Sequence, residues 1–352
     1  MVMCFPRLMC DMKVGDTDRK SVSFIVDAPY MNNKIFDFSQ SSRVKYFAIK
    51  QRFENLGYEV GTHDVVSPEC ANILIYLDRL PSIQHREFSS NKYLIAIESP
   101  IIKPEIYDGR NHSEFSLVFT WNDDWVDGVR YYKIRYALDF KHKMSGNYGA
   151  RQLSSMVFSN RLSSSQGELY SFRRTIIRWF ELHNQNDFHL YGRGWGVRKS
   201  KNRILSAILG FQVLGISFGK VLGGGFKSYR GEVIDKHSVI SGYKFVFCPE
   251  NVSGWNGYVT EKILDAISVG AVPIYSGAPN ISKYIPENMF ISFNEGDSFE
   301  DLYLHLLSYK ESDFIAHKKR CEEFFSGKGV SDFGIEQFVD SVCSPILRDV
   351  GG

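Results

Sequence analysis

The segment Tyr243–Gly277, which reads YKFVFCPENVSGWNGYVTEKILDAISVGAVPIYSG, constrains the fold of this chain more than any other. It predicts an apolar strand at Lys244–Cys248, a polar loop at Glu250–Gly257, an amphipathic helix at Thr260–Val269 and a second strand at Val272–Tyr275. A strand–loop–helix–strand unit is typical of parallel α/β sheets, whose ligands bind where the strands end.

The start of the predicted helix is a natural binding site for an anion. Thr260, Glu261 and Lys262 stand where the loop becomes helix. The free N–H groups and the positive end of the helix dipole gather at that point. A glutamate and a lysine beside it can hold sugar hydroxyls and diphosphate oxygens respectively. The pattern therefore predicts a transferase that uses a sugar nucleotide.

Length, charge and cysteine usage narrow the possible domain count, class of partner and cellular compartment. A chain of 352 residues favours two domains over one. The formal net charge is only +2, so nucleic acid is not an expected partner. The six cysteines are scattered without metal-ligand spacing. We expect idle thiols in a reducing, cytoplasmic compartment rather than a zinc site.

The rest of the chain alternates strand-like and helix-like stretches. In the first half, the expected helix is Val44–Leu56, and the expected strands are Ser21–Val26, Tyr58–Val60, Asn72–Leu77, Tyr93–Ile97 and Ser116–Phe119. In the second half, strands are expected at Phe188–Tyr191 and Met289–Phe293, with helices at Leu169–Leu182, Lys236–Ser241, Phe299–Leu307 and Ser312–Phe325. Such alternation predicts parallel sheets with helices on both faces.

We therefore expect an α/β protein of two doubly wound, Rossmann-like domains that face a cleft. The expected divisions are a poorly ordered lead-in at 1–20, an N-terminal domain at 21–145 and a C-terminal domain at 146–352. An apolar and basic insert is expected at 196–228. Its core, Ile204–Gly224, is either an interfacial segment on anionic lipid or a buried loop or helical hairpin between the domains.

The segment Tyr243–Gly277 resembles the donor-binding signature of the alpha-1,3-fucosyltransferases, family 10 of the glycosyltransferases. The stretches that carry the likeness are Tyr243–Phe245, Glu250–Asn251, Gly257–Lys262 and Val272–Gly277. Further likeness lies outside it: strong at Tyr191–Gly194, Tyr229–Gly231, Ala278–Ile281 and Tyr284–Pro286, and moderate at Glu98–Pro100 and Phe119–Trp121. Pro249 and the loop Val252–Asn256 depart from the family pattern, which leaves the exact sugar open.

The resemblance implies a GT-B fold and inverting transfer of L-fucose from GDP-fucose to O3 of N-acetylglucosamine or glucose. It places the donor in the C-terminal domain and the acceptor in the N-terminal domain. It implies no required cofactor and leaves room for stimulation by Mn²⁺ or Mg²⁺. We assign no metal site, although Asp123 and Asp124 superficially resemble the manganese pair of GT-A transferases.

Two carboxylates are the expected catalytic groups. Glu98 follows a predicted strand and precedes Pro100, which would point it into the cleft as the base for the acceptor hydroxyl. By the resemblance, Glu261 holds the fucose and stabilises positive charge on its ring. The alternatives are a solvated loop carboxylate for Glu98 and a first-turn helix residue for Glu261.

The remaining expected site residues bind the two substrates. Arg173 corresponds to the diphosphate-binding arginine of the family, unless the alignment slips by one residue to Arg174. The other expected donor contacts are Lys262 at the diphosphate, Asn251 and Tyr258 at the sugar and ribose, and Arg193 and Arg230 as weaker candidates. Trp121 and Trp125 are either an acceptor platform or core residues.

The expected partners are GDP-fucose and an oligosaccharide or lipid-linked glycan, such as a lipopolysaccharide O-antigen. An N-terminal anchor like that of Golgi members is not evident, which favours a bacterial-type enzyme in the cytoplasm, peripheral on the anionic inner membrane. Two other hypotheses remain open. One is the same fold with another nucleotide sugar, and the other is a catalytically silent glycan-binding protein.

Overall fold

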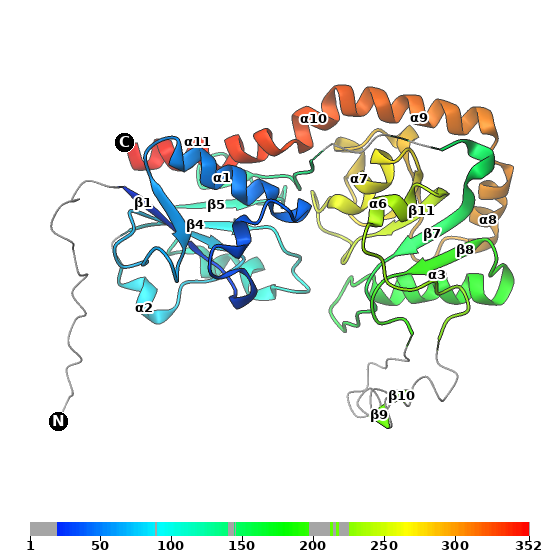
Figure 1. The fold of residues 1–352 in the computed structure, drawn as a ribbon, viewed down its shortest axis with the longest axis horizontal. Coiled ribbons are helices and arrows are strands. Elements are labelled where there is room, and N and C mark those ends of the chain that lie inside the picture. Colours follow the sequence, from blue (N-terminus) through cyan, green and yellow to red (C-terminus); the bar gives the residue numbers. More distant parts are fainter. Residues whose placement is uncertain are drawn as a thin grey trace.

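The computed structural model describes residues 20–351, except 89, 140–143, 145, 197–211, 214–215 and 218–224. Within these residues the chain forms two parallel sheets, each in its own domain, with helices packed on both faces (Figure 1). The expected α/β architecture of two doubly wound domains is confirmed. A parallel sheet covered on both faces explains why a central strand such as Ile73–Leu77 is a continuous apolar run.

The N-terminal sheet has the strand order β2-β1-β3-β4-β5-β6, with all neighbours parallel. Its strands are β1 (Ser21–Ile25), β2 (Glu59–Thr62), β3 (Ile73–Leu77), β4 (Asn91–Ala96), β5 (Leu117–Thr120) and β6 (Tyr131–Lys133). Alternate residues serve opposite faces, since Phe24 and Ile75 pack toward helix α1 (Val44–Glu54), whereas Ile25 and Tyr76 belong to the core of the other face. Short helical segments connect the strands, namely η1 (Ala28–Tyr30), η2 (Lys34–Phe36), η3 (Ser41–Arg43), α2 (Ile83–Arg86), η4 (Pro104–Tyr107) and η5 (Gly109–His112).

The C-terminal sheet has the order β13-β12-β11-β7-β8, again with all neighbours parallel. Its strands are β7 (Gln152–Val157), β8 (Phe188–Tyr191), β11 (Tyr243–Pro249), β12 (Val272–Ser276) and β13 (Ile291–Ser292). Helices α6 (Lys236–Ile240) and α7 (Glu261–Ser268) cover one face, and α3 (Tyr170–His183) and α8 (Phe299–Ser308) cover the other. Short 3-10 turns lie at η6 (Tyr148–Ala150), η7 (Ile281–Lys283) and η8 (Glu287–Met289).

The last helix of the chain packs in the N-terminal domain. Helices α9 (Glu311–Ser326), α10 (Lys328–Phe333) and α11 (Ile335–Gly351) run in sequence from the C-terminal to the N-terminal domain (Figure 1). The apolar side of α11, including Phe338 and Val342, packs into the core beside α1. The expected C-terminal domain, 146–352, includes this helix, but the structure places it on the first sheet.

Two helices were expected to close the chain, and the structure adds α10 and α11 after them. Pro345 lies inside α11, and an interior proline ordinarily argues against a helix. The two segments that connect the domains are in contact, because Leu138 N of the first donates to Phe333 O of the second at 2.8 Å. Arg135 also pairs with Asp332 at 3.7 Å.

Several expectations lie largely outside the described residues. Of the lead-in 1–20 only Lys20 is described, and of Ile204–Gly224 only β9 (Gln212–Val213) and β10 (Ile216–Ser217), which pair antiparallel. No helix in the described part of the chain is both long and apolar enough to cross a membrane. Among the cysteines, Cys248, Cys321 and Cys343 are free and buried, whereas Cys70 takes part in a disulfide, so the expectation of idle thiols is wrong for it.

Candidate active site

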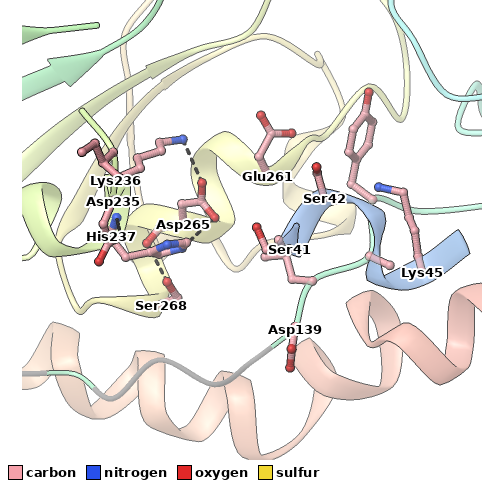
Figure 2. A pocket seen from close by; sticks show the side chains of 14 residues that line it. Ser41, Ser42, Lys45, Asp139, Asp235, Lys236, His237, Glu261, Asp265 and Ser268 are labelled. Carbon is pink, nitrogen blue, oxygen red and sulfur yellow. Dashed lines mark hydrogen bonds and ion pairs between the residues drawn. The ribbon is translucent and has the colours of Figure 1, made fainter. Parts of the chain in front are cut away.

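Two adjoining cavities lie where the carboxyl ends of the two sheets face each other. The larger has a volume of 550 Å³ and is lined by both domains (Figure 2). The smaller has a volume of 360 Å³ and lies in the N-terminal domain. Ser42, Lys45 and Tyr136 line both cavities. The cleft that the sequence predicts is therefore present, at the position where α/β domains bind ligands.

Helix α7 forms one wall of the larger cavity. Glu261, Asp265 and Ser268 line it from one stripe of this helix, because residues four and seven apart share a face. Figure 2 shows Glu261 across from Ser42 and Lys45, which come from the N-terminal domain. Glu261 of the C-terminal domain therefore faces residues of the N-terminal domain across the larger cavity.

Asp265 forms its hydrogen bonds with residues of its own domain. It is 4% exposed and accepts hydrogen bonds from Lys236 Nζ at 2.8 Å and His237 Nε2 at 3.1 Å. The Glu261 side chain is 43% exposed, with its Oε1 3.8 Å from Lys262 Nζ. Burial raises the pKa of the Glu261 carboxyl, but the charges of Lys262 and Lys236 outweigh it and leave the pKa below its usual value. Glu261 is therefore an ionised carboxylate that faces the cavity.

The corner before α7 is organised around Glu250, a residue with no exposed surface. Its carboxylate accepts from Thr260 N at 2.9 Å, from Thr260 Oγ1 at 2.8 Å and from Lys262 Nζ at 2.8 Å. Thr260 is also the N-cap of α7, since its Oγ1 accepts from Lys262 N at 3.4 Å. The expected helix start is therefore confirmed. The expected diphosphate lysine also stabilises this turn through a buried ion pair.

Glu98 lies two residues after β4 and lines the smaller cavity. The carboxyl end of a parallel strand is where the sequence placed it. Burial raises the pKa of the Glu98 carboxyl, and the charge of Glu261 adds to this, while the charge of Lys262 opposes it. A carboxylate with a raised pKa is a stronger base, which suits proton removal from a hydroxyl.

Arg173 and Arg174 point to different partners. Arg173 is 3% exposed, and its Nη2 donates to Pro249 O at 2.9 Å, Glu250 O at 2.7 Å and Asn251 Oδ1 at 3.1 Å. Burial lowers the pKa of this guanidinium to about 10. Arg174 instead donates to Asn160 Oδ1. Of the two arginines, Arg173 is therefore the one that contacts the loop at the end of β11 and the expected donor residue Asn251.

Arg193 and Arg230 lie away from the two cavities. The Arg193 side chain is 83% exposed, and its Nε is 3.5 Å from Glu232 Oε2. Arg230 Nη1 donates to the Lys227 carbonyl at 3.2 Å. Neither arginine is among the described residues that line either cavity. The structure does not bring them to the other expected donor residues.

The aromatic residues expected at the substrates form a packed cluster. Trp121 and Tyr258 are each 1% exposed, and their ring centroids are 4.6 Å apart. Trp121 therefore cannot offer its face to a sugar, and the alternative of core packing applies to it. Trp125 is half-buried and stacks on Tyr107 at 5.7 Å between ring centroids. Trp255, which was not expected at the site, meets Tyr107 from the C-terminal domain at 5.7 Å.

Asp123 joins the two domains. Its carboxylate pairs with Lys133 Nζ at 2.7 Å and accepts from Asn280 Nδ2 and Tyr284 Oη, each at 2.6 Å. Lys133 belongs to the N-terminal domain, and the other two partners belong to the C-terminal domain. Among the described residues, no group of acidic, histidine or cysteine side chains has the geometry to hold a metal ion.

The sequence did not single out Lys45 or Asp78, which line the smaller cavity beside Glu98. A signal for Asp78 was present, because a charged residue directly follows the buried strand β3, as Glu98 nearly does after β4. No comparable signal marks Lys45. It is one of several basic residues on α1, and only the tertiary arrangement turns it into the cleft.

Two parallel α/β domains around a cleft match the GT-B fold of solved glycosyltransferase structures. Among solved structures, an alpha1,3-fucosyltransferase with GDP aligns with a TM-score of 0.51 and 17% identity, covering 89% of this chain and 92% of that one. The Anabaena protein Alr3699/HepE, in complex with UDP and glucose, aligns with a TM-score of 0.56 and 10% identity, covering 94% and 100% of the two chains. At these identities the likeness shows the fold.

Residues 190–326 match the model of "Glycosyltransferase family 10 (fucosyltransferase) C-term". The matched stretch lies within the C-terminal domain. An alpha-(1,3)-fucosyltransferase of Helicobacter pylori is 37% identical over 89 residues, which are 24% of this chain and 18% of the relative. GDP-fucose protein O-fucosyltransferase 3 of Xenopus laevis is 27% identical over 133 residues, which are 32% of this chain and 28% of the relative. The chain thus spans less than a third of the length of these curated relatives.

Proposed function

We propose that this protein is an inverting alpha-1,3-fucosyltransferase that moves L-fucose from GDP-fucose to a hydroxyl held in the cleft. The observation that carries the proposal is that Glu98 and Glu261, from different domains, face two adjoining cavities. The family of the C-terminal domain and the names of its relatives support GDP-fucose as the donor.

In the proposed reaction, Glu98 removes the proton of the acceptor hydroxyl as that oxygen attacks the anomeric carbon of fucose. A new carbon–oxygen bond forms there, and the bond from that carbon to the diphosphate oxygen breaks on the opposite side. The electron pair of the broken bond leaves with GDP, and the proton remains on Glu98. Glu261, ionised and half-exposed, stabilises the positive charge that develops on the sugar ring.

The leaving diphosphate would lie at the start of α7. An ammonium has three N–H donors, and Lys262 Nζ uses two of them on Glu250 and Thr260. The third remains for a diphosphate oxygen, beside the positive end of the helix dipole. Arg173 orders the neighbouring loop and Asn251, while Tyr258 packs against Tyr136, which lines both cavities. This arrangement stabilises the leaving group with protein cations and N–H groups.

The proposed acceptor is a sugar of a surface glycan, attacked through O3 of N-acetylglucosamine or glucose. A lipid-linked O-antigen precursor would bring the enzyme to the cytoplasmic side of the inner membrane. The smaller cavity, at 360 Å³, is the proposed place for the reacting sugar. A second candidate acceptor is a protein hydroxyl, because several relatives carry the name GDP-fucose protein O-fucosyltransferase 3.

The donor and the acceptor can be tested together. Hydrolysis assays with GDP-fucose, GDP-mannose and UDP-sugars should show turnover of GDP-fucose above the others, and labelled GDP-fucose on a glycan array should identify the acceptor. Glu98→Gln should abolish transfer while GDP affinity stays near that of the wild type. Glu323→Gln on the exposed side of α9 is the charge-matched control. Binding of glycans without turnover of any donor would favour the silent glycan-binding protein instead.

A further inference from the structure

Side chains from outside β4 fix the backbone that carries Glu98. Asp78 Oδ1 accepts from the N–H groups of Ile97 at 2.8 Å and Glu98 at 2.9 Å. On the carbonyl side, Tyr136 Oη donates to Ile97 O at 2.5 Å, and Tyr107 Oη donates to Glu98 O. The N–H and C=O groups of both residues are therefore held, and the direction of the Glu98 side chain is set by its neighbours.

Asp78 has a left-handed backbone conformation. Its φ is +49°, in the left-handed region that residues other than glycine rarely adopt. It is 7% exposed and lines the smaller cavity. Burial raises the pKa of its carboxyl to about 7, and the charge of Glu98 adds to the rise. A strained, buried acid at a cavity points to a functional role.

Lys45 brings a positive charge to the same cavity. It is 7% exposed, and its Nζ lies 5.2 Å from the ring centroid of Tyr46 and 5.8 Å from that of Tyr136. Among the described residues, its ammonium takes part in no hydrogen bond or ion pair. Burial lowers its pKa to about 8, although the charges of Glu261, Asp78 and Glu98 raise it. A buried ammonium without a direct partner is costly, so a function rather than stability explains it.

These two residues belong to a larger set of groups around the Glu98 carboxylate. The charged and titratable side chains that face it or line its cavity are Asp27, Tyr30, Arg43, Lys45, Tyr46, Asp78, Lys103, Tyr107, Tyr136, Arg161, Tyr258, Glu261 and Lys262. Within this set, Asp27 and Lys103 pair with each other at 3.0 Å. Lys262 is paired with Glu250. Asp78 and Lys45 are thus a buried acid and a buried base with no counter-ion in direct contact.

We propose that Asp78 and Lys45 are positioning residues for Glu98: Asp78 fixes the peptide groups that aim its carboxylate, and Lys45 supplies the balancing positive charge from the facing helix. The inference rests on the proposed function, in which Glu98 is the base. Neither residue needs to touch the reacting atoms. Their effects reach the reaction through the direction and the charge of Glu98.

Paired substitutions separate these roles, because the two residues act on Glu98 with opposite charge. Asp78→Asn keeps an oxygen that can accept both N–H bonds but removes a carboxyl whose pKa is about 7, and with it the negative charge that develops as the pH rises toward that value. The ionised form of Glu98 is then easier to reach, and the acid limb of the kcat/KM profile should move to lower pH. Lys45→Met removes a positive charge and should move the same limb to higher pH. Lys45→Arg should restore it toward the wild-type position.

Loss of the backbone contact should have a different result. Asp78→Ala removes the acceptor as well as the charge, so kcat should fall by about 10- to 100-fold while KM for GDP-fucose stays near the wild-type value. Lys319→Met and Glu323→Gln, two exposed positions on α9, are controls that change the net charge equally far from the cleft. They should leave the pH profile where it is.

A readout without substrate keeps the inference separate from the proposed function. Titration of ¹³C-labelled carboxyl groups, with Glu98 assigned by Glu98→Gln, should show its pKa lowered in Asp78→Asn and raised in Lys45→Met. Shifts of this kind in a protein that turns over no GDP-fucose would support the inference and refute the function. An unmoved Glu98 pKa in both variants, or a shift of the same sign in both, would overturn the inference even in an active enzyme.

Discussion

The buried pair between Glu250 and Lys262 should be essential to the donor side of the cleft. Glu250 has no exposed side chain, that of Lys262 is 10% exposed, and the two charged atoms are 2.8 Å apart. Removing one member of such a pair leaves an uncompensated buried charge, which costs about 3–5 kcal/mol. Glu250→Gln and Lys262→Met should each lower the free energy of unfolding by that amount.

A double-mutant cycle measures this coupling. The variant Glu250→Gln/Lys262→Met buries no unpaired charge, so its loss of stability should be smaller than the sum of the two single losses by more than about 1 kcal/mol. Urea unfolding followed by tryptophan fluorescence gives the free energies, with the C-terminal domain fitted as its own transition if the two domains unfold separately. GDP affinity, measured by calorimetry, should fall most in the variants that lose the most stability.

The exposed pair Lys319–Glu323 provides the matched control for this cycle. Its side chains are 77% and 65% exposed, and the charged atoms are 3.9 Å apart. Glu323→Gln and Lys319→Met should each change stability by less than about 1 kcal/mol, because water already solvates both charges. If the buried substitutions cost no more than these, or if the double variant loses the full sum, the assignment of Glu250 as the organiser of this corner is refuted.

Three further outcomes are expected. Gly257→Ala should lower the free energy of unfolding in urea by more than about 1 kcal/mol, because φ is +83° and a Cβ would lie 2.3 Å from a backbone oxygen of the N-terminal domain. Gly254→Ala is the control: its φ is +81° but a Cβ would meet no atom, so this variant should lose less stability than Gly257→Ala. Burial lowers the pKa of His317 to about 4, so its neutral form supports the fold above pH 6.5, and about 3 kcal/mol should be lost as the pH falls from 6.5 toward 4. In His317→Gln the urea midpoint should depend less on pH over this range. Arg173→Lys should weaken GDP binding about tenfold through loss of the loop contacts, whereas Arg174→Lys should change it less than about threefold; equal effects would contradict the assignment of Arg173.

The elements at the centre of each sheet were predictable because their signals are local. The apolar run at β8 was expected at the residues that form it, and Thr260 was expected where α7 starts. Glu98 was placed correctly because the carboxyl end of a parallel strand follows directly from the strand itself. The pairing order of the strands depends on contacts between distant residues, and no pattern within the sequence indicated it.

Other features of the structure depend on contacts between distant residues and carried no local signal in the sequence. Trp121 follows β5 in a polar stretch that reads as a loop, and contacts with Tyr107, Trp255 and Tyr258 bury it. Lys262 carries a charge that suggests solvent or substrate, and its partner Glu250 lies twelve residues earlier, on the far side of the loop. Helix α11 contains a proline and packs on a sheet more than two hundred residues away in sequence. Periodicity predicts an amphipathic face but not the surface that it covers.

The return of α11 to the first sheet determines how this protein can be divided. A fragment made from residue 146 onward would carry the apolar side of α11 without its sheet, and a fragment that stops before residue 146 would leave the groove beside α1 open to water. Isolated halves should therefore be built by ending the donor half before Ile335 and by joining 335–351 to the first half through a designed linker. Proteolytic cutting between the sheets, for the same reason, should yield two pieces that stay together until denaturant releases the final helix.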